Sequence, residues 1–270
     1  RHPNVVVVHE LVNHRGEWHV VMDHVRGASL QEVLQQRVRL PADEATRVAL
    51  ALAEGLACLH AADVVHRDVK PGNVVISTSG RPVLLDLGLS KLHETSQALS
   101  KAGQVLGTPT YMAPEQIRDP QTVDGRADVY GLGATLYHML TGSPPHVGTA
   151  EEVLTQALTI VPKSPAECRG TVDAFASEIC MRCLAKDPRD RYATAADLVT
   201  ELRRHQSGVR AGRRGGSRLG FVVALISVAL LGGVAWALQA PRGPVGVSSA
   251  DVQREARALL EAPGFLAQDR

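Results

Sequence analysis

This sequence of 270 residues has no large excess of charge of either sign. Its 29 basic and 28 acidic side chains give a formal net charge of +1. A nearly neutral chain lacks the positive field that bulk binding to nucleic acid requires, so we expect no nucleic-acid partner. Apolar residues make up 44% of the chain. That share predicts one globular domain with appendages.

Cysteine is also sparse, and the four residues Cys58, Cys168, Cys180 and Cys183 are scattered along the chain. Free thiols are therefore expected instead of a disulfide framework. Cys180 and Cys183 form a single C-x-x-C pair in a segment whose apolar residues recur at helical spacing. A structural zinc site needs four ligands, so a buried helix face is favoured over a metal site.

Residues 4–12 and 17–25 are β-rich runs joined by a short polar connection, which is typical of a β-hairpin. Histidine recurs at intervals of five along this hairpin. A turn at Arg15-Gly16 places His9 opposite Met22, and the other histidines also face partners that are not histidine. Because a metal needs convergent ligands, the pattern predicts no metal site here.

The spacing of apolar residues predicts the remaining elements. Helices are expected over residues 29–36, 43–61, 126–140, 150–159, 172–185 and 194–204. Short apolar strands are expected at residues 74–76 and 83–85, on either side of a loop of turn-forming residues. This order predicts an α+β fold in which a hairpin, a helix and two strands precede a run of helices.

The most specific motif reads His66-Arg67-Asp68-Val69-Lys70-Pro71-Gly72-Asn73, and Asp86-Leu87-Gly88 follows thirteen residues after the asparagine. This pairing resembles the catalytic centre of a protein kinase, whose phosphoryl transfer needs a carboxylate for the acceptor hydroxyl and oxygen ligands for metal ions. A second motif reads Gly107-Thr108-Pro109-Thr110-Tyr111-Met112-Ala113-Pro114-Glu115. Together these motifs resemble the protein-kinase family over residues 1–206. The resemblance implies a mostly helical lower lobe with part of the upper-lobe sheet.

The resemblance assigns chemistry to particular residues. Asp68 would act as the general base for an attacking serine or threonine hydroxyl, and Lys70 would neutralise the transferring phosphoryl group. Asn73 and Asp86 would hold Mg²⁺, which prefers oxygen ligands. Thr108 resembles the threonine that bonds the catalytic aspartate and lysine. The implied cofactors are therefore ATP and Mg²⁺, and the implied substrates are proteins with serine or threonine acceptors.

Met22, Asp23 and Val25 resemble the gatekeeper and hinge, where backbone groups would hold the adenine of ATP. An ordinary strand end explains these residues equally well. The same resemblance makes Lys70, Asn73 and Asp86 contacts of the nucleotide as well.

Other residues receive structural roles. Glu115 is expected to form a buried ion pair with Arg191, and Asp128 is expected to anchor the backbone of the loop that begins at His66. Leu87, before Gly88, replaces the family's usual phenylalanine with another apolar side chain.

A regulatory role follows for Arg67, which the resemblance makes a buried cation beside Asp68. Phosphorylation of the activation segment would supply a matching anion. The candidate acceptors are Ser96, Ser100 and Thr110.

The family's G-x-G-x-x-G loop, its strand lysine and its partnering helix glutamate are not found ahead of the predicted hinge. Two explanations remain open, an active kinase recorded without its N-terminus and a catalytically silent pseudokinase scaffold. The intact set of motif residues favours the first. Alone, this chain is expected to bind ATP poorly and to be inactive.

Residues 219–238 contain no charged side chain and match the hydrocarbon thickness of a bilayer at 1.5 Å per residue. We therefore expect a transmembrane helix, preceded by an arginine- and glycine-rich linker at residues 207–218 that lies against anionic lipid. Six arginines and no acidic residue between residues 203 and 218 place that flank in the cytoplasm. Residues 239–270 would form a tail outside the inner membrane.

The sequence thus resembles a Hanks-type, membrane-anchored serine/threonine kinase. The predominance of arginine among the basic residues favours a bacterial source, and autophosphorylation in trans would involve a homodimer. A pseudokinase scaffold is the alternative.

Overall fold

The computed structural model divides into two units, residues 1–212 and residues 213–270. Residues 1–15, 17–86 and 109–207 are described, and all of them belong to the first unit. The described elements are β1 (Val8–His14), β2 (Glu17–Met22), β3 (Gly27–Ser29), α1 (Leu30–Arg37), α2 (Ala42–His60), η1 (Pro71–Asn73), β4 (Val74–Ser77), β5 (Pro82–Leu84), η2 (Pro109–Tyr111), α4 (Pro114–Arg118), α5 (Gly125–Thr141), α6 (Ala150–Thr159), α7 (Pro165–Cys168), α8 (Ala174–Cys183), η3 (Pro188–Asp190) and a last helix over residues 195–207.

Side-chain caps fix where several helices begin. Ser29 and Glu32 exchange hydrogen bonds at the start of α1, and Thr149 and Glu152 do the same at the start of α6. Each exchange satisfies backbone N–H groups that have no partner within the helix. The bounds of α6 are those predicted from the sequence, and the other long helices begin and end within a few residues of prediction.

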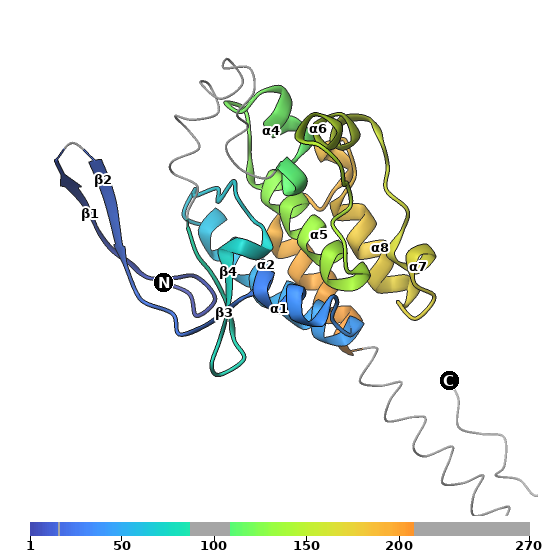
Figure 1. The fold of residues 1–270 in the computed structure, drawn as a ribbon, viewed down its shortest axis with the longest axis horizontal. Coiled ribbons are helices and arrows are strands. Elements are labelled where there is room, and N and C mark those ends of the chain that lie inside the picture. The colour runs from blue at the N-terminus through green and yellow to red at the C-terminus, as the bar shows by residue number, and fades with distance from the viewer. Residues whose placement is uncertain (16, 87–108, 208–270) are drawn as a thin grey trace, which may run out of the picture. The chain divides into compact units, whose positions relative to one another are not determined.

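Helix α5 forms the centre of the helical part, with α2 and α8 packed against it (Figure 1). Every residue of α5 from Ala127 to Leu140 is buried. A helix that is enclosed on all sides needs small residues where its neighbours approach. Gly133 is such a position, because a Cβ there would overlap the Cβ of Cys183 on α8.

Cys180 and Cys183 lie buried on α8, as expected for a helix face that packs in the core. Burial raises the pKa of both thiols, that of Cys183 to about 12. Both therefore remain protonated thiols near neutral pH, which makes them poor nucleophiles and poor metal ligands.

A three-stranded antiparallel sheet, ordered β3-β4-β5, lies beside α1 and α2. Val74 pairs with Leu84 across β4 and β5, and residue Val5 forms a further parallel bridge to Leu84. The short strand β3 was not predicted. Beyond the pairs of the ladder, the Leu85 N–H donates to the Asn73 carbonyl at 2.8 Å. This hydrogen bond places Leu85, the residue before Asp86, beside Asn73 at the end of the loop that begins at His66.

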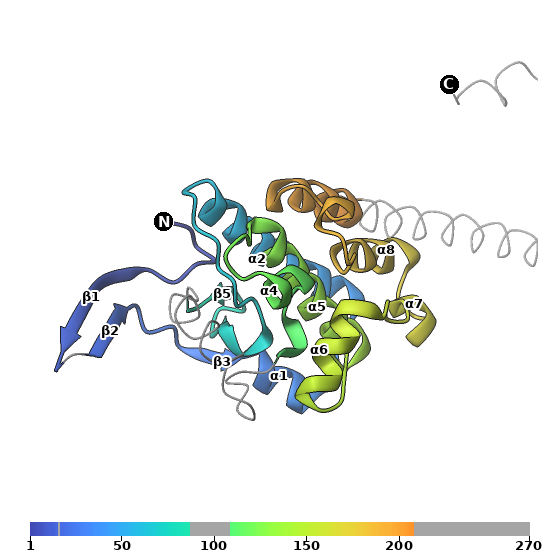
Figure 2. The ribbon, with the colours of Figure 1, turned by 90° about the horizontal axis from the view of Figure 1, so that it is seen from above.

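Strands β1 and β2 form a separate two-stranded sheet, and in both views they project away from the helices (Figures 1 and 2). The predicted pairing holds near the turn but is wrong at His9. Val8, and not His9, pairs with Met22, because a β-bulge interrupts the ladder between Val8 and Glu10. The displaced His9 ring instead contacts the Asp23 carboxylate at 2.8 Å.

No helix within the described ranges is long and apolar enough to cross a membrane. The predicted span at residues 219–238, the tail at 239–270 and the linker beyond residue 207 all lie outside the described residues. At the start of that linker, the last helix continues to residue 207.

Lys186 closes the C-terminal end of α6. Its ammonium donates to the carbonyls of Ala157 at 2.7 Å and Gln156 at 3.4 Å, and it contacts the ring of His146 at 3.2 Å. Half-burial, with the charge of Arg191 adding to it, lowers the pKa of Lys186 from 10.5 to about 8. Burial likewise lowers the pKa of His146 to about 4.

This arrangement predicts a pH dependence of stability. Between pH 8 and 10.5, the unfolded chain keeps a proton on Lys186 that the folded chain has released. Lys186 therefore makes the free energy of unfolding rise with pH across that window. Urea denaturation should show wild type gaining stability relative to Lys186→Met as the pH rises. Lys163→Met, at an exposed position, controls for the loss of one charge, and a constant or falling difference for Lys186 would contradict the prediction.

Candidate active site

The loop between α2 and β4 brings together three of the predicted catalytic side chains. The Lys70 ammonium lies 2.8 Å from Oδ2 of Asp68, and the Asn73 amide nitrogen donates to that same oxygen at 2.8 Å. The amide also donates to the Asp68 carbonyl at 2.9 Å. Pro71 starts the short helix η1, whose turn carries Asn73 back to Asp68. A carboxylate, an ammonium and an amide therefore converge within one turn of chain.

Asp128, in the first turn of α5, holds this loop against the core. Its carboxylate is 1% exposed and accepts the N–H groups of His66 at 2.8 Å and Arg67 at 2.7 Å. The ring of His60, at the end of α2, reaches the same carboxylate at 2.8 Å. The predicted anchoring contact is present, and the contribution of His60 was not predicted.

His66 connects the loop to the end of β5. Its Nδ1 accepts from the Asp68 N–H at 3.3 Å, so Nε2 carries the proton and donates to the Leu85 carbonyl at 2.7 Å. Burial lowers the pKa of His66 and outweighs the opposing pull of the carboxylates of Asp128, Asp68 and Asp86. The ring is therefore neutral at physiological pH, as both hydrogen bonds require.

Asn73 and Asp86 fit a magnesium ion by their chemistry. The hydrogen bonds of Asn73 use its amide nitrogen, so its oxygen is the atom suited to a metal. Asp86 is exposed and adopts a left-handed backbone with a φ of 46° immediately after β5. No group of three or more His, Cys, Asp or Glu side chains within residues 1–15, 17–86 and 109–207 could hold a metal. Magnesium needs only one or two protein oxygens besides phosphate and water, so the pair suffices.

A pocket adjoins Asp68 on the side of the second motif. It is lined by Arg67, Asp68 and Val69 of the loop, by Ala127 and Gly131 of α5, and by Tyr111, Met112 and Gln116. Gly131 permits the approach of α5 to the loop, because a Cβ there would lie 2.9 Å from the carbonyl oxygen of Val69. We call this space the acceptor pocket. Asp68 is one of the residues that line it.

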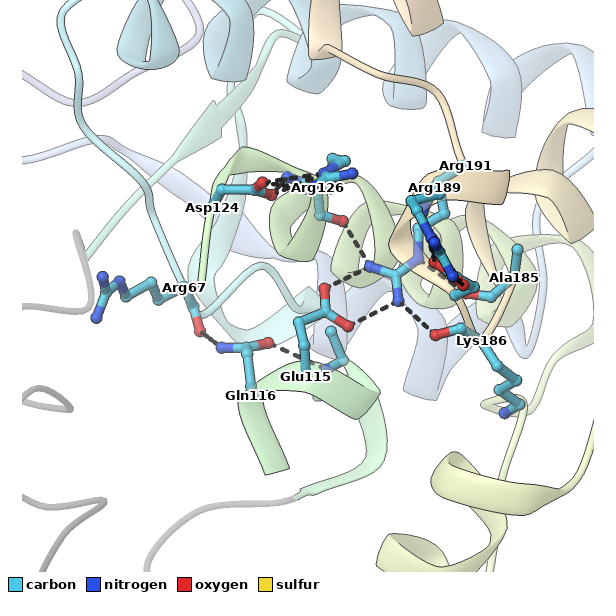
Figure 3. Close-up of polar contacts among 11 residues, drawn as sticks. Arg67, Glu115, Gln116, Asp124, Arg126, Ala185, Lys186, Arg189 and Arg191 are labelled. Carbon is cyan, nitrogen blue, oxygen red and sulfur yellow. Dashed lines mark hydrogen bonds and ion pairs between the residues drawn. The ribbon is translucent and has the colours of Figure 1, made fainter. Parts of the chain in front are cut away.

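Glu115 and Arg191 form the expected buried ion pair. The guanidinium contacts the two carboxylate oxygens at 2.6 and 2.8 Å, and the Arg191 side chain is fully buried (Figure 3). Arg191 also donates to three backbone carbonyls, those of Ala185, Lys186 and Arg126. The guanidinium therefore ties α4 to α5 and to the segment after α8.

The structure changes two of the regulatory expectations. Arg67 is half-buried instead of buried, and its side chain points away from Gln116 in Figure 3. Thr110, a predicted phosphorylation site, is only 8% exposed because η2 turns it inward. A kinase could not reach that hydroxyl in this conformation. Ser96 and Ser100 lie outside the described residues.

The predicted hinge follows the hairpin. Met22 ends β2, and Asp23 and Val25 lie between β2 and β3. The Asp23 N–H donates to the Val7 carbonyl at 2.9 Å, so this N–H is already used within the hairpin. Thr108, Leu87 and Gly88 lie outside the described residues.

Gln116 is a residue of this site that the sequence analysis missed. Its amide nitrogen donates to the Arg67 carbonyl, and its amide oxygen accepts the Ala113 N–H. A glutamine three residues after Ala113, which precedes α4, is a capping pattern that could have indicated part of this role.

A loop with these three side chains, anchored on the central helix of a helical lobe below a small sheet, defines the protein-kinase fold. A protein-family model described as "Protein kinase domain" matches residues 1–206, so the chain belongs to this family. A solved structure, the crystal structure of Rad53 1–466 in complex with AMP-PNP, shares this fold. It matches with a TM-score of 0.62 at 22% identity, over 74% of this chain and 50% of that one.

Curated relatives are serine/threonine-protein kinases of bacteria. PkaA of Streptomyces coelicolor is 38% identical over 77% of this chain and 38% of its own length. PknB of Mycobacterium leprae is 32% identical over 77% of this chain and 34% of its own length. The chain thus spans about a third of the length of these relatives.

Proposed function

We propose that this chain carries the catalytic lobe of a bacterial, Hanks-type serine/threonine protein kinase, which transfers the γ-phosphoryl group of ATP to protein hydroxyls. The observation that carries the proposal is the convergence of Lys70 and Asn73 on one oxygen of Asp68, each at 2.8 Å. Surface residues with only a structural role have no reason to direct an ammonium and an amide onto one carboxylate that lines a pocket. The names of the bacterial relatives support the same activity.

In the proposed reaction, an acceptor hydroxyl enters the acceptor pocket and donates its proton to Asp68. Asn73 orients the carboxylate through the amide hydrogen bond, and Lys70 offers its positive charge to the phosphoryl group as that group moves. Magnesium, held by Asn73 and Asp86, would neutralise charge on the phosphates. Thr108, outside the described residues, is proposed to favour serine and threonine acceptors by contacting Asp68 and Lys70.

We propose that backbone groups of Asp23 and Val25 form the hinge that binds the adenine, and that Met22 is the gatekeeper beside it. With the Asp23 N–H already bonded to Val7, the Asp23 carbonyl and the backbone of Val25 are the groups that would hold the adenine of ATP. The glycine-rich loop and its lysine are expected ahead of this sequence, so activity should be sought in the full-length protein.

We further propose that residues 219–238 anchor the protein in the inner membrane with the kinase domain in the cytoplasm. The uncharged run and its arginine-rich flank support this topology. A single span leaves two copies free to meet in the bilayer, and we propose that autophosphorylation occurs in trans within such a dimer. Membrane fractionation should recover the full-length protein with lipid, and a variant lacking residues 219–238 without it.

The test is transfer from γ-labelled ATP by full-length protein, with and without a chelator of magnesium. Label on serine or threonine that requires the metal supports the proposal. Label on tyrosine would contradict the proposed acceptor class. Tight nucleotide binding without any label on protein would instead favour the pseudokinase scaffold.

A further inference from the structure

We propose that Gln116 is a positioning residue for Asp68, an inference that rests on the proposed phosphotransfer function. Gln116 is half-buried in the first turn of α4, on the wall of the acceptor pocket. Its side-chain amide joins two segments that lie 46 residues apart in sequence, Arg67 and Ala113. Each end of the amide is engaged, so the side chain has one defined orientation (Figure 3).

The hydrogen bond that would position Asp68 is the one from Gln116 to Arg67. The Gln116 nitrogen donates to the Arg67 carbonyl at 2.9 Å. That carbonyl and the Asp68 N–H belong to one planar peptide group. The Asp68 N–H donates to the His66 ring at 3.3 Å, so the peptide is held at both ends. Fixing this plane fixes the N–Cα bond of Asp68 and so restricts where its side chain can leave the backbone.

Arg67 needs such support because of its backbone conformation. Its φ is 66°, in the left-handed region that a residue other than glycine adopts only when its surroundings hold it there. Asp128 holds the N–H of Arg67 at 2.7 Å, and Gln116 holds its carbonyl. Without Gln116, one of these two restraints is lost. The peptide before Asp68 is then held only by the bond from the Asp68 N–H to His66, so it rotates more easily toward a commoner conformation.

The position of Gln116 is itself fixed by the neighbouring residue. Glu115 is bound by the buried guanidinium of Arg191, which prevents α4 from shifting. Gln116 therefore transmits the placement of α4 to the catalytic loop. A competing explanation is that Gln116 only caps α4, since its oxygen accepts the Ala113 N–H at 3.0 Å. The two roles use different atoms of the amide, so they can be separated.

Gln116→Glu separates them in the full-length protein. A carboxylate still accepts the Ala113 N–H and is an equally good capping group. It cannot donate to the Arg67 carbonyl. We expect an unchanged KM for ATP, with kcat lowered about tenfold because the base is misplaced. Gln116→Met, which loses both bonds, should lose kcat to the same degree and some thermal stability as well.

The pH profile provides a readout that a capping role would not affect. As the pH falls, the introduced carboxyl group gains a proton and can donate to the Arg67 carbonyl again. The ratio of kcat for Gln116→Glu to kcat for wild type should therefore rise toward low pH. A wild-type kcat for Gln116→Glu would overturn the proposal. So would a loss of kcat in Gln116→Met alone, because that result assigns the effect to the cap.

Hydrogen exchange keeps this inference separate from the proposed function. Amide exchange at residues 66–69 should be faster in Gln116→Glu than in wild type, whether or not the protein transfers phosphate. If wild type is inactive and exchange still accelerates, the kinase proposal fails and the positioning role stands. If wild type is active while kcat and exchange are both unchanged in the variant, the positioning role fails.

Discussion

Asp68→Asn in the full-length protein is expected to lower phosphoryl transfer by about 10²- to 10⁴-fold, the usual contribution of a positioned general base. The amide has the shape of the carboxylate but cannot take a proton from an acceptor hydroxyl. It also removes the charge that pairs with Lys70 at 2.8 Å. Single-turnover transfer of labelled phosphate measures the chemical step, and titration with nucleotide should show that ATP binding is retained.

Asp63→Asn is the matched control for that substitution. Asp63 lies five residues before Asp68, is exposed, and has a positive φ of 56° that asparagine also tolerates. We expect transfer to remain at the wild-type rate. Comparable rates for Asp68→Asn and wild type would remove Asp68 from the mechanism. Equal losses in both variants would show that the assay responds to charge in this region and not to a base.

Arg191→Met should destabilise the fold by about 3 to 5 kcal/mol, the usual cost of removing one member of a buried pair. The methionine fills part of the volume but leaves the Glu115 carboxylate without its cation. It also leaves the carbonyls of Ala185, Lys186 and Arg126 without that donor. Each buried polar group that loses its partner adds to the cost. Urea denaturation followed by circular dichroism measures the change in the free energy of unfolding.

Arg189→Met tests whether the effect depends on burial. Arg189 also pairs with an acidic residue, Asp187 at 2.6 Å, but its side chain is 83% exposed. An exposed pair contributes about 1 kcal/mol or less, so this variant should unfold nearly as wild type does. Similar losses in the two variants would contradict the assignment of the larger effect to the buried network. A double variant that adds Glu115→Gln to Arg191→Met should recover part of the loss, because the remaining buried charge is gone.

How much of this molecule the sequence predicts depends on whether a feature is local. The convergence of Lys70 and Asn73 on Asp68 could be anticipated, because the three residues lie in one short loop. The long helices could also be anticipated, because apolar residues recur along them at helical spacing. Some helices also begin at a capping side chain, as α1 does at Ser29 and α6 at Thr149. The ion pair between Glu115 and Arg191 spans 76 residues and followed from the family resemblance.

Other features depend on contacts that no local pattern carries. The bulge at His9 is associated with its contact with Asp23 across the hairpin, where alternation alone predicts a regular ladder. Thr110 is a polar residue in a segment that looks like an exposed loop in the sequence, but the turn around it buries its side chain. His60 lies 68 residues from Asp128, and nothing in its neighbourhood indicates that contact. In each case tertiary packing decides the outcome.

The attachment of the catalytic loop to α5 has a consequence for heat inactivation. In many enzymes the reactive groups are on a marginal loop that loses its arrangement well before the protein melts. Here the N–H groups of His66 and Arg67 are bonded to the buried carboxylate of Asp128 on α5, so we expect the loop to stay attached until that helix is exposed to water. Residual turnover and residual folded protein should consequently decline together as the temperature rises.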